Sequence, residues 1–176
     1  PVANDTNSLH GSLIRHICGD KSGSVYIHSQ GGINRYDLRT GKVSNLQHEN
    51  ADAISYGTSG LWIAERNKIF EYRNGIKTLY VELPESQAQI RILRETSQKL
   101  LVAGTLASGV YIIDPNRKIR KAIEVSSQVS SIFEDSRKNI WVGTWYDGLY
   151  RVEKNGRIRN YQPDRSKPRN SLSSSF

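Results

Sequence analysis

A repeat of short strand-like runs constrains the fold of this 176-residue chain more than any other feature of its sequence. The second run of each unit begins at Val25, Leu61, Leu100 or Ile140, so the units are 36, 39 and 40 residues apart. That period is typical of a four-stranded propeller blade. It does not fit a helical repeat, because the apolar pattern has a period of two residues and Gly, Asn and Ser interrupt it every few residues.

The fourth unit, residues 131–161, is the clearest copy of the repeat. It contains four strand-like runs, and a turn signal follows each of the first three. The last signal, Asn155-Gly156, predicts a hairpin with a type I′ turn, because both central residues of that turn need positive φ. The unit therefore reads as a four-stranded antiparallel meander.

The whole chain, residues 1–176, is interpreted as a partial all-β propeller: about four blades of a larger, seven-bladed propeller. The tripeptide Asn-Ser-Leu at 7–9 recurs at 170–172, and the chain contains no Met, so we expect an excised piece of a longer protein. Missing blades, or a second copy, are expected to cover the outer blade faces, since repeats bury their faces against neighbours. The approximate blade boundaries are 7–48, 49–84, 85–126 and 127–169, with 170–176 as the start of the next blade.

The composition, 36% hydrophobic and 24% charged, is that of a soluble globular protein. No apolar run approaches the roughly 20 residues of a membrane helix, and no signal peptide is visible. The single cysteine, Cys18, excludes an internal disulfide and is expected to be a buried, inert thiol rather than a nucleophile.

Positive charge is concentrated in the last third of the chain. The net charge is +8, to which residues 1–114 contribute +1 and residues 115–176 contribute +7. Such a patch can attract phosphates or acidic sugars. The simpler interpretation is that solvated hairpin turns carry Lys and Arg, because no unbroken basic run occurs. Direct nucleic-acid binding is not expected, since aromatic residues are not interleaved with the basic ones.

The pattern I-x-E-D-x-x-x-N-I-W-V-G-T-x-x-x-G-L-Y-R, from Ile132 to Arg151, resembles the two-component regulator propeller repeat, as does the Asn-Ser-Leu opening. The first unit matches well. The third has Thr96-Ser97-Gln98 in place of the acidic turn, and the second lacks both the turn Asp and the Gly-Thr. The resemblance implies an N-terminal fragment of the periplasmic sensor domain of a Bacteroides-type hybrid two-component system.

In that family the sensor domain is attached to a membrane-spanning histidine kinase, a response regulator and a DNA-binding region. The resemblance therefore implies a location on the periplasmic side of the inner membrane, in a membrane-anchored parent protein. It also implies that the signal is an oligosaccharide and that the phosphorelay controls transcription of polysaccharide-utilisation genes. A homodimer is expected in the full receptor.

No group of residues predicts catalysis, a metal site or a cofactor. Glu134-Asp135 is an acidic pair, but neighbouring strand residues point to opposite faces and do not readily flank one bond as glycosidase carboxylates do. Asp135 is expected to accept backbone N–H groups in its own turn. The histidines show no zinc-ligand spacing. They are His10, His16, His28 and His48.

The loop between the second and third strands of the fourth unit is the best candidate for ligand binding. In propellers such loops lie on one rim, around the central channel. The rings of Trp145 and Tyr146 suit stacking on sugar faces, and the carboxylate of Asp147 can bind sugar hydroxyls. The competing interpretation is that Trp145 or Tyr146 packs against a neighbouring blade or a dimer partner. Trp62 and Trp141, inside second strands, are expected in the core.

The matching loops of the first two units add polar groups to this rim. Gln30 belongs to the first unit, and Glu65 and Arg66 belong to the second. The Arg66 guanidinium can pair with the carboxylate of an acidic sugar. The third unit offers Leu106-Ala107-Ser108. The candidate ligand-binding residues are therefore Trp145, Tyr146, Asp147, Arg66, Glu65 and Gln30.

The leading functional hypothesis is a non-enzymatic sensor of an oligosaccharide. The second is a structural, protein-interaction or dimerisation propeller without a small ligand. A carbohydrate-active propeller enzyme ranks last, because no unit supplies a convergent acid and base.

Overall fold

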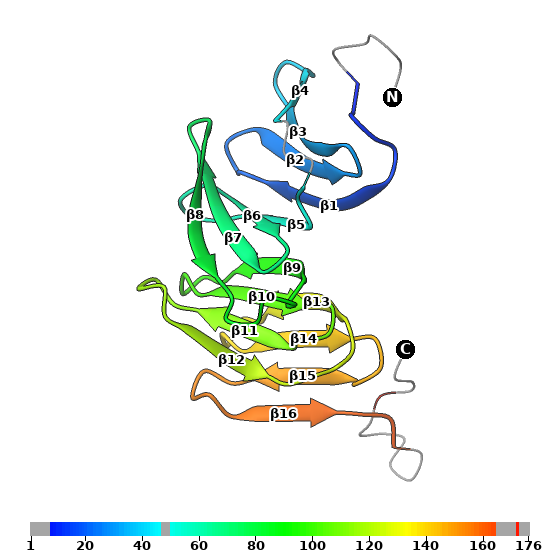
Figure 1. Ribbon diagram of the computed structural model, residues 1–176, viewed down its shortest axis with the longest axis vertical. Helices are drawn as coiled ribbons and strands as arrows, with labels where there is room; N and C mark the ends of the chain where they lie inside the picture. The colour runs from blue at the N-terminus through cyan, green and yellow to red at the C-terminus, as the bar shows by residue number, and fades with distance from the viewer. Residues whose placement is uncertain (1–7, 47–49, 165–171, 173–176) are drawn as a thin grey trace. The chain divides into compact units, whose positions relative to one another are not determined.

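The computed structural model describes residues 8–46, 50–164 and 172. The chain divides into two compact units, Pro1–Glu82 and Leu83–Phe176. The regular secondary structure of the described residues consists of β-strands alone. They form two four-stranded antiparallel sheets in each unit (Figure 1). The first unit contains β1 (Ile14–Gly19), β2 (Ser24–Ser29), β3 (Gly32–Asp37), β4 (Val43–Asn45), β5 (Ala53–Tyr56), β6 (Leu61–Glu65), β7 (Lys68–Arg73) and β8 (Ile76–Glu82). The second contains β9 (Ile90–Glu95), β10 (Leu101–Thr105), β11 (Val110–Ile113), β12 (Ile119–Ile123), β13 (Val129–Glu134), β14 (Ile140–Thr144), β15 (Leu149–Val152) and β16 (Ile158–Tyr161).

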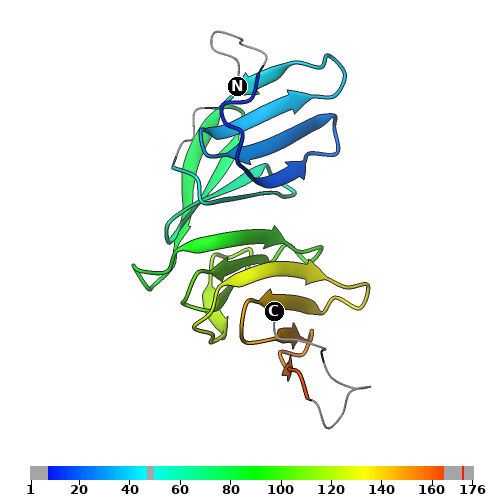
Figure 2. The ribbon, with the colours of Figure 1, turned by 90° about the vertical axis from the view of Figure 1, so that its right-hand side faces the viewer.

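Each sheet is a meander in which strand order follows chain order: β1–β4, β5–β8, β9–β12 and β13–β16. Within the units, β1 contacts β5 and β9 contacts β13, so the first strands of adjacent sheets lie side by side (Figure 2). This is the arrangement of inner strands in neighbouring propeller blades. The sheets are called blades 1 to 4 below, and the predicted all-β propeller class is confirmed.

Each unit buries a hydrophobic core between its two blades. In the first unit, Ile33 of blade 1 packs with Ile54, Leu61 and Ile63 of blade 2. Alternate residues of a strand point to opposite faces, so the period-two pattern of the sequence places these side chains on the facing surfaces. The core between blades 3 and 4 includes Val102, Val110, Ile112, Ile132, Ile140 and Val142.

A recurrent capped turn joins the first two strands of most blades. In blade 4, Asp135 Oδ1 accepts the backbone N–H groups of Arg137 and Asn139, both at 2.9 Å. This confirms the prediction for Asp135. Asp20 accepts two backbone N–H groups in the same way in blade 1. In blade 3 the hydroxyl of Thr96 accepts one backbone N–H, that of Leu100, so an uncharged side chain caps the turn there.

The two Asn-Gly pairs form different hairpin turns. Asn74-Gly75 has positive φ at both residues, 52° and 84°, as a type I′ turn requires. At Asn155-Gly156 only the glycine has positive φ, and the type I′ prediction there is wrong. The N–H of Glu153 donates to the carbonyl of Arg157, which leaves a three-residue loop with Gly156 in the left-handed position. The predicted hairpin itself is present.

The two strand tryptophans differ in burial. Trp62 is 5% exposed, and its predicted place in the core is confirmed. Trp141 is only half-buried, so the core prediction is wrong there. Its neighbours Ile140 and Val142 face blade 3, so Trp141 lies on the opposite face of blade 4. There its indole N–H donates to Asp135 Oδ2 at 2.8 Å.

Cys18 is half-buried, so the expectation of a buried side chain is wrong in degree. Burial still raises the pKa of its thiol to about 12, which keeps the thiol protonated. The predicted opening of a fifth blade, 170–176, lies outside the described residues apart from Leu172, which forms an isolated bridge with Pro163. In the described part of the chain, no helix is long and apolar enough to cross a membrane.

Candidate functional site

Hydrogen bonds around Thr144 hold the loop after β14, and this set of bonds is called the frame of the loop below. Thr144 donates from both its N–H and its hydroxyl to the carbonyl of Gly148, at 3.1 and 2.7 Å. The same hydroxyl accepts the N–H of Asp147 at 3.0 Å. The N–H of Trp145 donates to the carbonyl of Gln128, at 3.0 Å, which ties the loop to the connection that enters blade 4. The backbone under the aromatic residues is therefore held at both ends.

Glycine is required where this loop enters β15. Gly148 has a φ of 78°, and a Cβ added there would overlap the carbonyl oxygen of Tyr161. Both the left-handed conformation and the close approach of the neighbouring strand select glycine.

Asp147 fixes the same loop from its side chain. Its Oδ2 accepts the backbone N–H of Ser127 at 3.2 Å and also the hydroxyl of that residue. Its own carbonyl accepts the Asn160 side-chain amide at 3.0 Å. The carboxylate predicted to bind sugar hydroxyls therefore also holds the loop, through one of its two oxygens.

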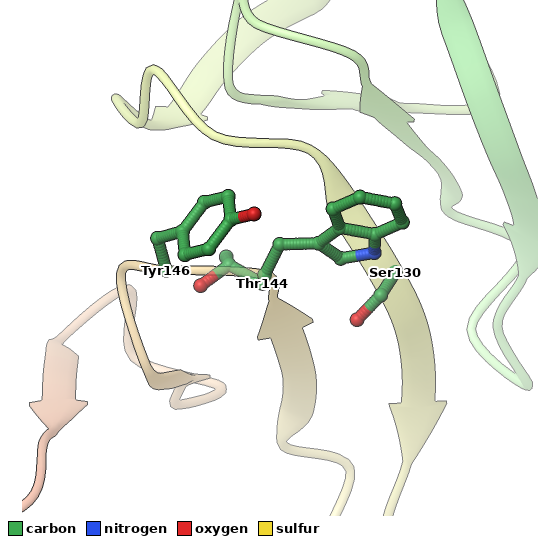
Figure 3. A pocket seen from close by; sticks show the side chains of 4 residues that line it. Ser130, Thr144 and Tyr146 are labelled. Atoms are coloured by element: carbon green, nitrogen blue, oxygen red, sulfur yellow. The ribbon is translucent and has the colours of Figure 1, made fainter. Parts of the chain in front are cut away.

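The frame presents two exposed aromatic rings. Trp145 is 50% exposed and Tyr146 is 64% exposed, with their rings edge-to-face at 6.3 Å between centroids. Together with Ser130 and Thr144 they line an open hollow of about 610 Å³. Figure 3 shows Tyr146 projecting from the loop, Thr144 at its base and Ser130 on the adjacent strand. A hollow with apolar faces and few hydroxyls suits a ring with an apolar face and a polar edge.

The other predicted rim residues belong to the first unit. Gln30 lines a small polar hollow of about 240 Å³. It shares this hollow with Arg15, His28, Ser29, Asn50, Ala51 and Asp52. His28 is buried there, and burial together with the field of His16 lowers the pKa of its imidazole to about 4, so it is neutral at pH 7.

Glu65 and Arg66 are partly engaged in the hairpin of blade 2. The carboxylate of Glu65 forms an ion pair with the Lys77 ammonium, with 2.6 Å between Oε1 and Nζ. Arg66 has a φ of 55° in the turn, and its N–H donates to Asp52 Oδ2 at 2.7 Å. The Asp52 contact links Arg66 to the hollow of Gln30. The structure therefore gathers the predicted residues in two groups, one in each unit.

Sequence reasoning missed two residues of the aromatic hollow, Ser130 and Thr144. Thr144 carries a usable signal, because Thr-x-x-x-Gly occurs after the second strand in blades 3 and 4 and forms the same frame in both. Ser130 carries none, since only strand pairing brings it to the loop. In the described residues, no three His, Cys, Asp or Glu side chains gather as a metal site would require.

Comparison with known proteins places the two aromatic residues of this loop at the end of a recognised repeat. Residues 124–146, which end on the aromatic pair, match the family described as Two component regulator propeller. The chain therefore contains a two component regulator propeller repeat, as its residues predicted. No curated protein matches the sequence.

Solved structures share the fold across nearly the whole chain. One is the extracellular domain assigned to the hybrid two component system BT4673 from B. thetaiotaomicron, at 16% identity and a TM-score of 0.73, covering 94% of this chain and 24% of that chain. A second is the equivalent domain of BT3049 from the same organism, at 16% identity and 0.57, covering 98% and 31%. A third is virginiamycin B lyase from Staphylococcus aureus, at 19% and 0.72, covering 92% and 58%. The chain thus spans about a quarter of the BT4673 domain. At sequence identities this low, the structural similarity shows a shared fold and no more.

Proposed function

We propose that this chain, a propeller segment that contains a two component regulator propeller repeat, is part of the periplasmic ligand-sensing domain of a membrane-anchored hybrid two-component receptor. The ligand is an oligosaccharide, and its binding regulates polysaccharide-utilisation genes through an attached histidine kinase. The single observation that carries the proposal is the exposed pair Trp145 and Tyr146, which ends the matched repeat and stands on a loop held by hydrogen bonds.

The chemistry of the hollow supports a sugar ligand. An aromatic ring stacks on the apolar C–H face of a pyranose, and hydroxyl groups bind its polar edge. The Ser130 hydroxyl lines the hollow together with the two rings and supplies such a polar group. The rigid loop limits the ordering entropy lost on binding.

Signal transmission follows from a difference in affinity between two receptor states. A ligand shifts an equilibrium only as far as its affinities for the two states differ. We propose that the states differ in the geometry of blades or of the receptor homodimer around the aromatic loop. The ligand then favours the arrangement in which its stacking contacts are complete.

Calorimetry with the purified chain and with the longer ectodomain tests the sugar site. The titrants are xylo-, arabino-, manno- and cello-oligosaccharides. We expect one of them to bind, and Trp145→Ala to weaken that binding roughly tenfold or more through lost apolar contact. Leu106→Ala, at the equivalent position of blade 3, is the matched control and should leave the affinity unchanged. Full affinity in the Trp145 variant removes this loop from the site.

A second function, dimerisation or protein interaction without a small ligand, is favoured by one observation. The face of blade 4 opposite blade 3 exposes Phe133 by 58%, beside its strand partner Trp141. Light scattering after size exclusion separates the two functions. Concentration-dependent dimers in a protein that binds no oligosaccharide support the interaction role.

The same fold also occurs in an enzyme, the virginiamycin B lyase. We propose a non-enzymatic role for this chain, because its aromatic hollow is lined by two rings and two hydroxyl side chains and has no acid and base among its lining residues. Turnover of an oligosaccharide by the purified chain would overturn that choice.

A further inference from the structure

A second hollow lies in the first unit, between blades 1 and 2, and none of the residues predicted from the sequence line it. Its volume is about 390 Å³. Three phenol rings bound it, those of Tyr26 on β2, Tyr56 on β5 and Tyr72 on β7, together with the side chains of Arg35 and Arg73. The rest of the lining is Leu46, Ser59, Gly60, Asn74 and Gly75.

Strand pairing explains why these side chains converge. Tyr26 and Arg35 are direct partners across β2 and β3. In blade 2, Leu61 is paired on one side with Tyr56 and on the other with Tyr72. Directly paired residues share a face of a sheet, so the two groups stand on the facing surfaces of the blades. The rings of Tyr26 and Tyr56 stack across the gap, with centroids 5.4 Å apart.

The hollow opens at the end of blade 2 opposite the loop of Arg66. Its lining includes Ser59 and Gly60 of the turn between β5 and β6, and Asn74 and Gly75 of the turn between β7 and β8. In a meander these two turns lie at one end of the sheet, and the loop between the middle strands lies at the other. The hollow is therefore distinct from the loops that carry the proposed oligosaccharide site.

Two cations and no carboxylate line this hollow. Arg35 donates from Nε to the Ser24 hydroxyl at 2.9 Å, which holds the side chain and leaves its terminal nitrogens to bind a ligand. In the part of the chain that the structure describes, neither Arg35 nor Arg73 forms an ion pair with a carboxylate. The nearby Asp20 carboxylate accepts N–H groups of its own turn.

The phenol hydroxyls are hydrogen-bond donors at neutral pH. Burial raises the pKa of Tyr26, as does the proximity of Tyr56. Burial and then the charge of Asp20 raise the pKa of Tyr56, while Arg35 and Arg73 both act in the opposite direction. Arg35, Arg73 and Tyr56 line the same hollow, so one ligand there can contact all three side chains.

We propose that this hollow binds a sugar ring that carries one carboxylate, a hexuronic acid unit. A guanidinium binds a carboxylate through two parallel hydrogen bonds, and a second guanidinium adds charge and a second direction of approach. The stacked tyrosine rings supply flat apolar surface for the ring of the sugar, and their hydroxyls supply polar contacts at its edge. A bare inorganic anion would use only the first of these features.

Titration of the purified chain with sodium glucuronate, followed by NMR chemical shifts or calorimetry, tests the proposal. Glucose and sodium sulfate are the comparison titrants, since one lacks the charge and the other lacks the ring. We expect glucuronate to bind at least tenfold more tightly than either, and its affinity to fall as salt rises because the contact is ionic. Equal affinity for glucose or for sulfate overturns the assignment.

Matched variants locate the site. Arg73→Gln and Arg35→Gln should each weaken glucuronate binding roughly tenfold or more, because each removes charge-assisted hydrogen bonds. Arg39→Gln changes an exposed arginine of blade 1 that does not line the hollow, and it should leave the affinity unchanged. Arg73 is exposed at a strand end, so its variant is expected to fold even if the Arg35 variant does not. Unchanged glucuronate affinity in Arg73→Gln overturns the proposal.

The two proposed sites fail independently. Trp145→Ala should leave glucuronate binding intact, because the aromatic loop and this hollow belong to different units. Loss of glucuronate binding in Trp145→Ala, in a chain that circular dichroism shows to be folded, would assign the acid to the aromatic loop and overturn the second site.

Discussion

The loops after the second strands of blades 3 and 4 have the same frame and different surfaces. In blade 3, Thr105 donates from its N–H and hydroxyl to the Gly109 carbonyl at 3.1 and 2.8 Å, as the equivalent residues of blade 4 do. Between them blade 3 carries Leu106-Ala107, whereas blade 4 carries Trp145-Tyr146. The repeat therefore keeps the positions that bend and tie the backbone and varies the two residues that face outwards.

The two loops also differ in how they join the connection that enters the blade. Both make one backbone bond to it, from Leu106 to Gln89 in blade 3 and from Trp145 to Gln128 in blade 4. Blade 4 adds the contact between Asp147 and Ser127. In blade 3 the matching residue, the buried Ser108, makes a side-chain hydrogen bond to Glu85 of the entering connection. Both loops therefore have a side-chain tie at this position, from a carboxylate in blade 4 and from a hydroxyl in blade 3.

The largest effect expected from this comparison is on stability, at the glycine that closes each loop. Gly109→Ala and Gly148→Ala should each lower the free energy of unfolding by about 2 to 4 kcal/mol. Both residues have positive φ, and an added Cβ would overlap the carbonyl oxygen of Ile123 or Tyr161. Urea denaturation of the two variants measures the effect.

Gly156→Ala is the matched control, because Gly156 also has positive φ but has no heavy atom within 4 Å of an added Cβ. It should cost only about 1 kcal/mol, the strain of the backbone alone. If Gly148→Ala costs no more than this control, the close approach of β16 is not what selects glycine in the frame.

The capped turns of blades 3 and 4 differ in charge, which predicts a difference in acid sensitivity. Hydrogen bonds from the Trp141 indole, and then from Asn139, lower the pKa of Asp135 from 3.8 to about 2. A carboxyl with a lowered folded-state pKa contributes stability above its unfolded pKa, and that stability is lost as pH falls from about 4 towards 2. The Thr96 hydroxyl in blade 3 does not titrate in this range.

Unfolding free energies of the parent chain and of Asp135→Asn, measured between pH 2 and 6, test this difference. The parent should be the more stable of the two above pH 4, and the gap should close as the pH approaches 2. Thr96→Ser, which keeps a hydroxyl, should give a gap that does not change with pH. A gap at Asp135 that stays constant to pH 2 would mean that its ionised form is not favoured by folding.

The fold was accessible from the sequence because it depends on local signals that recur. Three such signals indicate a blade without reference to distant residues: alternating apolar residues, turn residues such as Asp135, and the regular spacing of the second strands. The turn at Asn155-Gly156 was misjudged because the pairing of Glu153 with Arg157 adds a residue to the loop. Register of this kind is set by the whole hairpin, not by the dipeptide.

The sites were harder to predict, because they depend on residues that are distant in the sequence. Trp145 and Tyr146 were found because they interrupt a repeat, and an aromatic pair in a loop is visible in one dimension. The tyrosine and arginine hollow was not found, because Tyr26 and Tyr56 belong to different blades and meet only when the two sheets face each other. Each of its tyrosines and arginines, taken alone, reads as an ordinary strand residue.

The smallest effect on stability is expected where the two loops differ most. Replacing Trp145-Tyr146 by Leu-Ala gives blade 4 the outer residues of blade 3 and should change the free energy of unfolding by only about 0.5 kcal/mol, because both rings are at least half exposed. The same exchange should abolish oligosaccharide binding. Urea denaturation and calorimetry on one variant measure both. A loss of several kcal/mol would show that the rings hold the blade together, whereas unchanged stability with lost binding would assign them to the ligand. The reverse exchange, Leu-Ala to Trp-Tyr in blade 3, should also be tolerated, since the frame there is the same.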